Sequence, residues 1–339
     1  MYLKKRYLLL ILLLGAIVVG PRSHFEPVGT VLPQLELDLE EVEAFVAHQE
    51  AHLQNLKPDN GSRIVWADSL RRTPYAVVYL HGFSASPVEG APLHREFARR
   101  YGCNLYLPRL AGHGLDDRES FVDLTPEALM ASAREALAIG QVLGEKVILM
   151  SCSTGSTLSA FLAAAQPEAV DALLMYSPNF ALENPATQLL TGPWGLQIAR
   201  ATIGGKYRSI QLPENCHPYW TITYRVEGLV ALQGLLDQTM NEKTYRGVMQ
   251  PFFLGYYYKN EEARDQVISI DEIQRFAETS ATPADQRRLV AFPEAGGHII
   301  TSDLQSKDLE SVRRETYKFA EEVLKLAVLK PVGESTTTN

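Results

Sequence analysis

Apolar strand-like runs alternate with helix-like segments along most of the chain after residue 62. Short runs rich in β-branched and aromatic residues predict buried strands, and the Ala-, Leu- and Glu-rich stretches between them predict helices. This alternation indicates an α/β fold with a mostly parallel central sheet and helices on both faces. We expect strands at residues 63–67, 76–80, 104–107, 146–150, 172–176, 251–258 and 288–292, and helices at 38–56, 91–101, 125–144, 155–165, 269–279 and 308–328.

The composition narrows the class of protein. With 339 residues, 46% of them apolar, the chain can bury a large core without disulfides or structural metal. A net charge of -8 argues against a nucleic-acid binder, which needs a basic surface. The three cysteines exclude a disulfide-dense scaffold and form no CxxC pair for zinc or redox chemistry.

Residues 181–250 interrupt the alternation with prolines and aromatic residues and show no strand-like period. An insertion of this length between two core strands predicts a cap or lid over the carboxyl ends of the strands. We therefore expect a linker and N-terminal helix at 21–61, a core at 62–180 and 251–330, and a disordered polar tail at 331–339.

The N-terminus has a basic and then an apolar segment. Lys4, Lys5 and Arg6 precede the apolar run 7–20. That run is shorter than the roughly 20 residues of a spanning helix and is typical of a signal-peptide core. We expect residues 1–20 to act as a signal peptide or uncleaved anchor, so that the protein is exported to the cell envelope, periplasmic or secreted, and can associate with a membrane through residues 7–20. The alternative is a buried N-terminal helix.

A small-residue turn connects the strand at 146–150 to the following helix. Residues 151–155 read Ser-Cys-Ser-Thr-Gly, which matches the strand–turn–helix pattern G-x-S-x-G with Ser151 in place of the first glycine. The sharp turn projects the hydroxyl of Ser153 above the sheet, and Gly155 supplies the small residue that close helix packing requires. Ser153 is therefore the candidate nucleophile, and the alternative is an ordinary strand-to-helix loop.

Cys152 is a rival nucleophile in the same turn. Thr154, where a cysteine-centred motif would need glycine, gives it no matching frame. The residue beside a nucleophile in such a turn also points away from the cleft. We therefore expect Cys152 to be structural.

His81, Gly82 and Phe83 directly follow the strand at 76–80. The backbone N–H just beyond this strand is the usual second donor of an oxyanion hole, beside the N–H that follows the nucleophile. We expect Phe83 and Thr154 to supply these two donors, and His81 and Gly82 to shape the loop.

A serine nucleophile needs a base, and the base needs a carboxylate that fixes its tautomer. His298 alone among the eight histidines follows the last predicted strand, in a loop of small residues. The acid should follow the strand at 251–258, where Asp265 is favoured because the apolar residues after it can return to the core. Carboxylates that remain alternatives there are Glu261, Glu262 and Asp271.

These motifs resemble the α/β-hydrolase superfamily, and above all its monoglyceride-lipase and serine-aminopeptidase-like branch. The resemblance is carried by His81-Gly82-Phe83-Ser84, Pro108-Arg109-Leu110-Ala111-Gly112-His113-Gly114, Ser151-Cys152-Ser153-Thr154-Gly155, Asp265-Gln266-Val267 and Gly297-His298. It implies the α/β-hydrolase fold with an inserted cap, a Ser153–His298–Asp265 triad, and catalysis without a metal or organic cofactor. The cap is the variable part of this family, so the substrate does not follow from the resemblance.

The function that the sequence favours is cleavage of a small carboxylic ester, apolar or aromatic, by a carboxylesterase or lipase-like serine hydrolase. One alternative is a peptidase or amidase of the same fold, in which Glu183, Glu214 or Glu227 of the cap would bind a substrate amine. Another is a non-catalytic binding protein that retains the fold. Transfer of the acyl group to an acceptor other than water is also compatible with the motifs.

Overall fold

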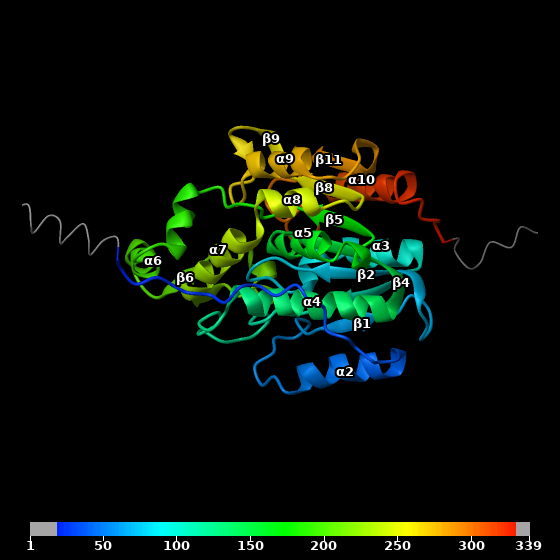
Figure 1. Ribbon diagram of the computed structural model, residues 1–339, viewed down its shortest axis with the longest axis horizontal. Coiled ribbons are helices and arrows are strands. Elements are labelled where there is room, and N and C mark those ends of the chain that lie inside the picture. Colours follow the sequence, from blue (N-terminus) through cyan, green and yellow to red (C-terminus); the bar gives the residue numbers. More distant parts are fainter. Residues whose placement is uncertain (1–18, 330–339) are drawn as a thin grey trace, which may run out of the picture.

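The computed structural model describes residues 19–329, and its centre is a seven-stranded sheet in the order β1-β3-β2-β4-β5-β8-β11 (Figure 1). β1 pairs antiparallel with β3, and every other pairing in this sheet is parallel. The predicted α/β fold with a mostly parallel sheet is confirmed. The strands are β1 (Arg63–Val65), β2 (Thr73–Leu80), β3 (Asn104–Leu107), β4 (Gly144–Cys152), β5 (Ala172–Tyr176), β8 (Phe252–Tyr256) and β11 (Arg287–Ala291).

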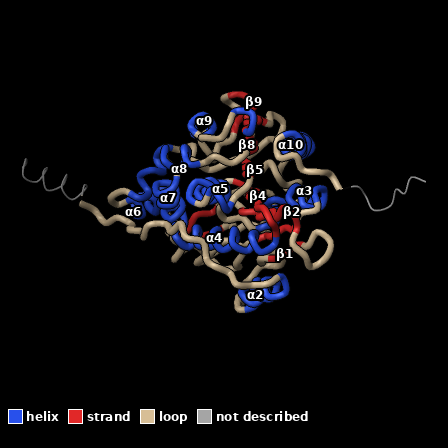
Figure 2. The backbone as a smooth tube through the Cα atoms, turned by 45° about the vertical axis from the view of Figure 1, so that its right-hand side comes forward, coloured by secondary structure: helices blue, strands red, loops and turns tan. Residues whose placement is uncertain are grey.

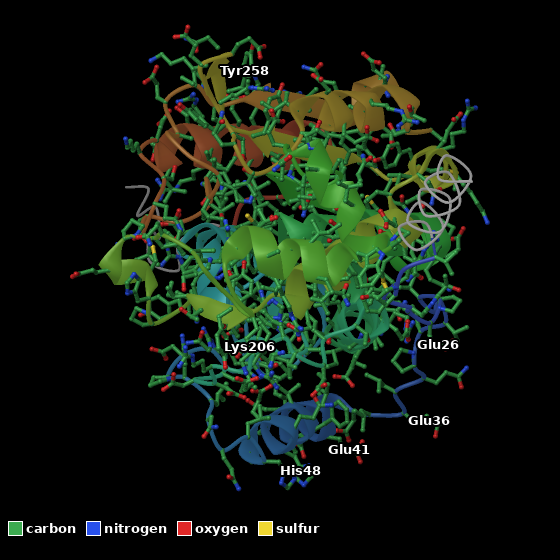
Figure 3. The ribbon with its side chains drawn as sticks, turned by 90° about the vertical axis from the view of Figure 1, so that its left-hand side faces the viewer. Glu26, Glu36, Glu41, His48, Lys206 and Tyr258 are labelled. Atoms are coloured by element: carbon green, nitrogen blue, oxygen red, sulfur yellow. The ribbon has the colours of Figure 1, made fainter. Side chains whose placement is uncertain are left out.

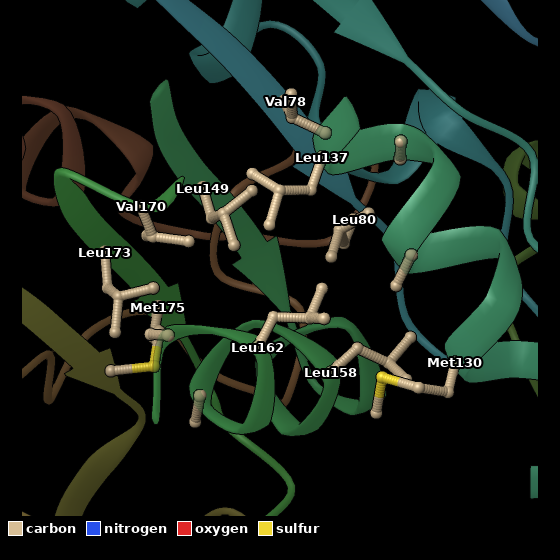
Figure 4. Close-up of a cluster of buried hydrophobic side chains, with 14 of the residues drawn as sticks. Val78, Leu80, Met130, Leu137, Leu149, Leu158, Leu162, Val170, Leu173 and Met175 are labelled. Atoms are coloured by element: carbon tan, nitrogen blue, oxygen red, sulfur yellow. The ribbon is translucent and has the colours of Figure 1, made fainter. Parts of the chain in front are cut away.

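Helices cover both faces of this sheet, as the tube in Figure 2 shows. Alternate residues of the parallel strands point to opposite faces, so Val78 and Leu80 pack in one core cluster while Val77 and Tyr79 pack in the other. Side chains of α4, α5, α8 and α9 complete the first cluster, part of which is shown in Figure 4, and those of α3 and α10 complete the second. The helices are α2 (Leu39–Ala51), α3 (Leu93–Tyr101), α4 (Pro126–Leu143), α5 (Thr154–Ala165), α8 (Glu242–Gly247), α9 (Ile270–Thr279) and α10 (Leu309–Glu322).

The chain between β5 and β8 forms short elements beside the carboxyl ends of the strands. Backbone hydrogen bonds connect it to core loops, among them those from Thr221 to Ser84 (2.7 Å) and from Arg225 to Ser120 (3.0 Å). Its last helix, α8, packs against α5 and α9 through the buried Tyr245, so it also belongs to the helical layer. The other elements are η3 (Pro185–Thr191), α6 (Gly195–Ile203), β6 (Tyr207–Ser209), η4 (Glu214–Cys216), β7 (Thr223–Arg225) and α7 (Glu227–Thr239).

Several expected elements have other bounds in the structure. The helix expected at 38–56 ends at Ala51, and the chain beyond it turns and forms an isolated antiparallel bridge between Leu56 and Leu115. The strand expected at 251–258 ends at Tyr256, and a hairpin of β9 (Tyr258–Asn260) and β10 (Ala263–Arg264) follows it. The helix expected to reach residue 328 ends at Glu322, because the chain then turns so that the N–H of Leu329 bonds the carbonyl of Arg100 on α3 (2.9 Å).

The N-terminal arm before α2 runs past α6, α7 and α4 (Figure 1). Its backbone N–H groups at Val28 and Gly29 donate to Gln238 (2.9 Å) and Glu127 (2.6 Å). Figure 3 shows His48 of α2 and Tyr258 of β9 at opposite ends of the molecule. Within residues 19–329, every helix is too short or too polar to cross a bilayer. The predicted signal or anchor segment lies almost wholly outside the described residues, as does the tail at 331–339, and both stay predictions.

Candidate active site

Ser153 occupies the turn between β4 and α5. Its backbone lies at φ 51° and ψ -119°, outside the regions that a residue with a side chain ordinarily adopts. Hydrogen bonds on both sides stabilise this conformation: Ser153 donates to the carbonyl of Tyr176 (3.0 Å) and accepts from the N–H of Asn179 (3.1 Å). The strain is located at the residue that the sequence predicted as nucleophile.

The close packing of β4 and α5 requires small residues two positions before and two positions after Ser153. Ser151 and Gly155 meet this requirement in different ways. A Cβ on Gly155 would lie 1.9 Å from the carbonyl oxygen of Leu80, so no side chain fits at this position. Ser151, which replaces the usual glycine, is fully buried, and its hydroxyl lies 3.1 Å from that of Ser156. The hydroxyl at 151 is therefore satisfied inside the turn.

His298 and Asp265 form a hydrogen-bonded pair, with 2.6 Å between Nδ1 of the imidazole and Oδ2 of the carboxylate. The other oxygen of Asp265 accepts from the N–H of Val267 (2.8 Å), and the Asp265 side chain is fully buried. A carboxylate only accepts, so Nδ1 carries the proton and Nε2 is the acceptor in neutral His298. Burial alone would lower the pKa of His298. The charge and hydrogen bond of Asp265, together with the charge of Glu89, raise it by more than that, so the pKa lies above its usual value of 6.5.

The segment after β5 brings the loop of His298 to the nucleophile turn. Ser177 donates through its hydroxyl to the carbonyl of His298 (2.5 Å), and Asn179, two residues later, donates to the carbonyl of Ser153. Both turns thus share one short segment beside β4. The structure joins the predicted acid and base directly, and it connects their loop to the turn of the predicted nucleophile through residues 177–179.

The alternative acids lie elsewhere. Glu261, Glu262 and Asp271 are exposed, and Glu261 accepts from the hydroxyl of Tyr258 (2.9 Å) in the β9–β10 hairpin. Of the candidate carboxylates in this part of the chain, Asp265 is the one that bonds His298.

The loop after β2 is held by hydrogen bonds of His81. Nε2 of His81 accepts from the N–H of Leu110 (3.1 Å), so Nδ1 carries the proton and donates to the carbonyl of Gly82 (2.9 Å). Burial and then the neighbouring His113 lower the pKa of His81 well below its usual value, so the ring is neutral. Thr154 is the first residue of α5, so its N–H has no acceptor within the helix and can serve an oxyanion.

The sequence motifs do not predict two features of the site. Phe83 packs against Phe121 of the core and Tyr224 of the cap, with ring centroids 4.8 and 5.5 Å away, so an aromatic wall stands beside the predicted oxyanion donor. Glu89 is buried in η1 (Pro87–Gly90) and accepts from the N–H of Gly82 (2.7 Å). For Glu89, the sequence shows only that a carboxylate lies close to the His-Gly-Phe motif.

Other reactive groups do not compete with Ser153. All three cysteines have free, buried thiols. Burial, and then the charges of Glu89 and Asp265, raise the pKa of Cys152 well above its usual value, which keeps it a thiol and a weak nucleophile. Within residues 19–329, no three His, Cys, Asp or Glu side chains are grouped as a metal site would require.

Solved structures with this architecture include lipases and esterases. A structure from work on LipS and LipT, two metagenome-derived lipolytic enzymes, matches with a TM-score of 0.64 at 17% identity, covering 78% of this chain and 98% of that one. The monoacylglycerol lipase of Paleococcus ferrophilus matches with a TM-score of 0.55 at 15% identity (76% and 96% covered). Est1E of Butyrivibrio proteoclasticus with bound ferulic acid matches with a TM-score of 0.52 at 16% identity (80% and 100% covered).

Sequence comparison places the chain in a family. A search of curated proteins finds no match. The model of the alpha/beta hydrolase family matches residues 77–308, which span β2 to the start of α10 and include the strand ends that carry Ser153, Asp265 and His298. The chain belongs to the alpha/beta hydrolase family.

Proposed function

We propose that the protein is a serine hydrolase that cleaves a carboxylic ester through an acyl-enzyme on Ser153. The observation that carries the proposal is the 2.6 Å bond between His298 and the buried Asp265, at a turn adjoining the strained Ser153. This arrangement provides a nucleophile, a base in the correct tautomer and a group that stabilises the imidazolium.

In the proposed reaction, the Ser153 hydroxyl attacks the ester carbonyl carbon while Nε2 of His298 takes its proton. The N–H groups of Phe83 and Thr154 donate to the oxyanion that forms on the carbonyl oxygen. The C–O bond to the alcohol then breaks, and the imidazolium returns the proton to the leaving oxygen. Water attacks the acyl-enzyme by the same proton route and releases the acid.

The lining of the site supports an apolar or aromatic substrate. The half-buried Phe83 packs on the buried rings of Phe121 and Tyr224, and it is the member of this aromatic cluster that a substrate can reach. Aromatic rings contribute large apolar contact areas in ligand sites. The lipolytic enzymes and the ferulic acid complex among the solved structures with this fold agree with an ester substrate.

The charges of the cap weigh against the peptidase alternative. A substrate amine would need an unpaired carboxylate, but Glu183 pairs with Arg264 (2.6 Å) and Glu227 pairs with Arg200 (2.6 Å). Glu214 remains, and it is exposed on the surface of η4. Ester cleavage is therefore favoured.

Labelling with a fluorophosphonate probe tests the assignment, because the probe phosphonylates an activated serine. We expect the wild-type protein and C152A to be labelled, S153A to be unlabelled, and S153A to lose roughly 10⁴-fold or more of its p-nitrophenyl ester hydrolysis. Labelling of a folded S153A protein would show that another residue is the nucleophile. An unlabelled wild-type protein would favour the non-catalytic alternative.

A further inference from the structure

Glu89 is a buried carboxyl group that the proposed reaction does not use. It lies in η1 between β2 and α3, and the residue is 1% exposed. Its Oε2 accepts from the N–H of Gly82 (2.7 Å) and from the hydroxyl of Tyr79 (3.2 Å). Burying a carboxyl group is unfavourable unless hydrogen bonds compensate, so this placement calls for a function.

The bond from Gly82 to Glu89 orients the predicted oxyanion donor. The carbonyl of Gly82 accepts from Nδ1 of His81 (2.9 Å) and from the N–H of Ala85 (3.3 Å). In a trans peptide the C=O and the following N–H point in opposite directions, so these bonds turn the N–H of Phe83 away from His81 and Ala85. Glu89 fixes the preceding peptide through the N–H of Gly82, and the loop is therefore held on both sides of Gly82.

Gly82 lies between this carboxyl group and the nucleophile. A Cβ on Gly82 would lie 2.7 Å from Oε1 of Glu89 and 3.1 Å from the Cβ of Ser153. The carboxyl group thus packs directly against the backbone that faces Ser153, and a shift of Glu89 would shift the loop relative to the nucleophile.

Glu89 also interacts with the other loops of the site. Its carbonyl accepts from the hydroxyl of Thr301 (3.2 Å), in the loop of His298, and the charges of Glu89 and His298 stabilise each other. The titratable groups that face it are Tyr79 of β2, Cys152 at the end of β4 and His298. One residue therefore contacts the oxyanion loop, the nucleophile strand and the loop of the base.

We propose that Glu89 is a positioning residue for the oxyanion hole: its carboxyl group holds the Gly82 peptide so that the N–H of Phe83 points at the developing oxyanion. This inference rests on the proposed serine hydrolase function. It predicts that the substrate binds without Glu89, but that the transition state is stabilised less. The hydrogen-bond acceptor at position 89 supplies the positioning, and its charge additionally raises the pKa of His298.

Two substitutions separate these effects. Glu89→Gln retains an oxygen that can accept from Gly82 but has no charge, whereas Glu89→Ala has neither. A misplaced oxyanion donor costs up to about 10²–10³ in kcat, so we expect E89A to lose roughly 10–100-fold in kcat with KM within about threefold of wild type. E89Q should recover most of that kcat, while the acid limb of its pH–kcat/KM profile moves to lower pH because the charge that raises the His298 pKa is gone.

Glu127→Gln is the matched control, because Glu127 of α4 also accepts from a backbone N–H, that of Gly29 (2.6 Å), and has no contact with the loops that carry Ser153, Asp265 and His298 among those described. It should leave kcat and the pH profile as in wild type. Folding of each variant is checked by circular dichroism and thermal melting. If E89A does not fold, Glu89→Leu, which fills the space of the side chain without an acceptor, takes its place with the same expected loss of kcat.

The inference is overturned if folded E89A, or E89L in its place, retains kcat within twofold of wild type. Equal losses of kcat in E89Q and E89A would also contradict it, because an acceptor at position 89 should suffice. A wild-type protein that fluorophosphonate does not label at Ser153 would instead refute the proposed function, and this inference with it.

Discussion

Replacing Asp265 by asparagine removes a charge while retaining the shape of the side chain. In the structure both carboxylate oxygens accept hydrogen bonds, one from His298 (2.6 Å) and the other from the N–H of Val267 (2.8 Å). An asparagine has one oxygen and one NH₂ group, so it can accept only one of these bonds. The two orientations of the amide therefore have different consequences for His298.

If the amide oxygen faces Val267, its NH₂ group faces Nδ1 of His298. The imidazole must then carry its proton on Nε2, and it cannot take the proton of Ser153. If the oxygen faces His298, the NH₂ group of the asparagine faces the N–H of Val267. This partly buried N–H then loses its acceptor, which costs about 1 kcal/mol. The inactive tautomer is therefore favoured by roughly fivefold.

Losing the charge adds a second cost. A hydrogen bond to a charged partner contributes about 1.5–3 kcal/mol, and this contribution grows as His298 becomes an imidazolium. The two effects together predict a fall in kcat of roughly 10²–10³. Because Asp265 raises the pKa of His298, the acid limb of the kcat/KM profile of D265N should also move to lower pH.

The measurement is steady-state hydrolysis of a p-nitrophenyl ester between pH 5 and 9, with Asp271→Asn as the matched control. Asp271 is exposed in the first turn of α9, so D271N should behave as wild type. A folded D265N protein with kcat within tenfold of wild type, or with an acid limb at the wild-type pH, would refute the role given to Asp265.

Three further predictions concern the turn and the buried acid. Gly155→Ala should lower the free energy of unfolding by about 3 kcal/mol or more, measured by urea denaturation, because its Cβ would meet the immobile backbone of Leu80 at 1.9 Å. Ser151→Gly should cost about 1–2 kcal/mol of stability, through the lost contact with Ser156 and added chain entropy, while fluorophosphonate labels it within threefold of the wild-type rate. Burial raises the pKa of Glu89 from 4.5 to about 7, so its contribution to stability is complete below pH 4.5 and is lost as the pH rises through 7. The urea midpoint of wild type should therefore fall relative to that of E89Q between pH 5 and pH 7.5, and parallel midpoints would contradict this.

The central strands were the most predictable part of the fold. The expected bounds 104–107 and 172–176 coincide with β3 and β5, because these strands are buried along their whole length and read as continuous apolar runs. β2 and β4 begin earlier than expected, at Thr73 and Gly144, which pair with each other. The first residues of these strands include polar ones outside the core, so an apolar pattern does not reveal them.

The predicted end of α10 was wrong for a different reason. Apolar residues continue at helical spacing beyond Glu322, which is why the sequence predicts a longer helix. Leu326 is buried in the second core cluster without being helical. The same apolar side chain can be buried from either conformation, and contacts with α3, distant in sequence, decide between them.

The candidate site was predictable where chemistry follows directly from a strand end. Ser153 and His298 each come soon after a predicted strand, and parallel strands place such residues at one edge of the sheet. The acid was less certain, because several carboxylates follow β8 within a few residues. Asp265 differs from Glu261 by its burial and by the N–H of Val267, and both depend on how the loop folds back.

The sequence does not predict that Glu89 belongs to the site, although this residue is only seven positions from Gly82. A glutamate in a loop of small residues is ordinarily a solvated charge, and no motif distinguishes it. Its burial requires α3 on one side and the loop of Thr301 on the other, and these segments meet only once the sheet has formed. The reacting groups of such a site can therefore be predicted because they follow strand ends in the sequence. The residues that orient them cannot, because their positions depend on how the loops pack together. For this reason the decisive substitutions at Glu89 test geometry, and those at Ser153 test chemistry.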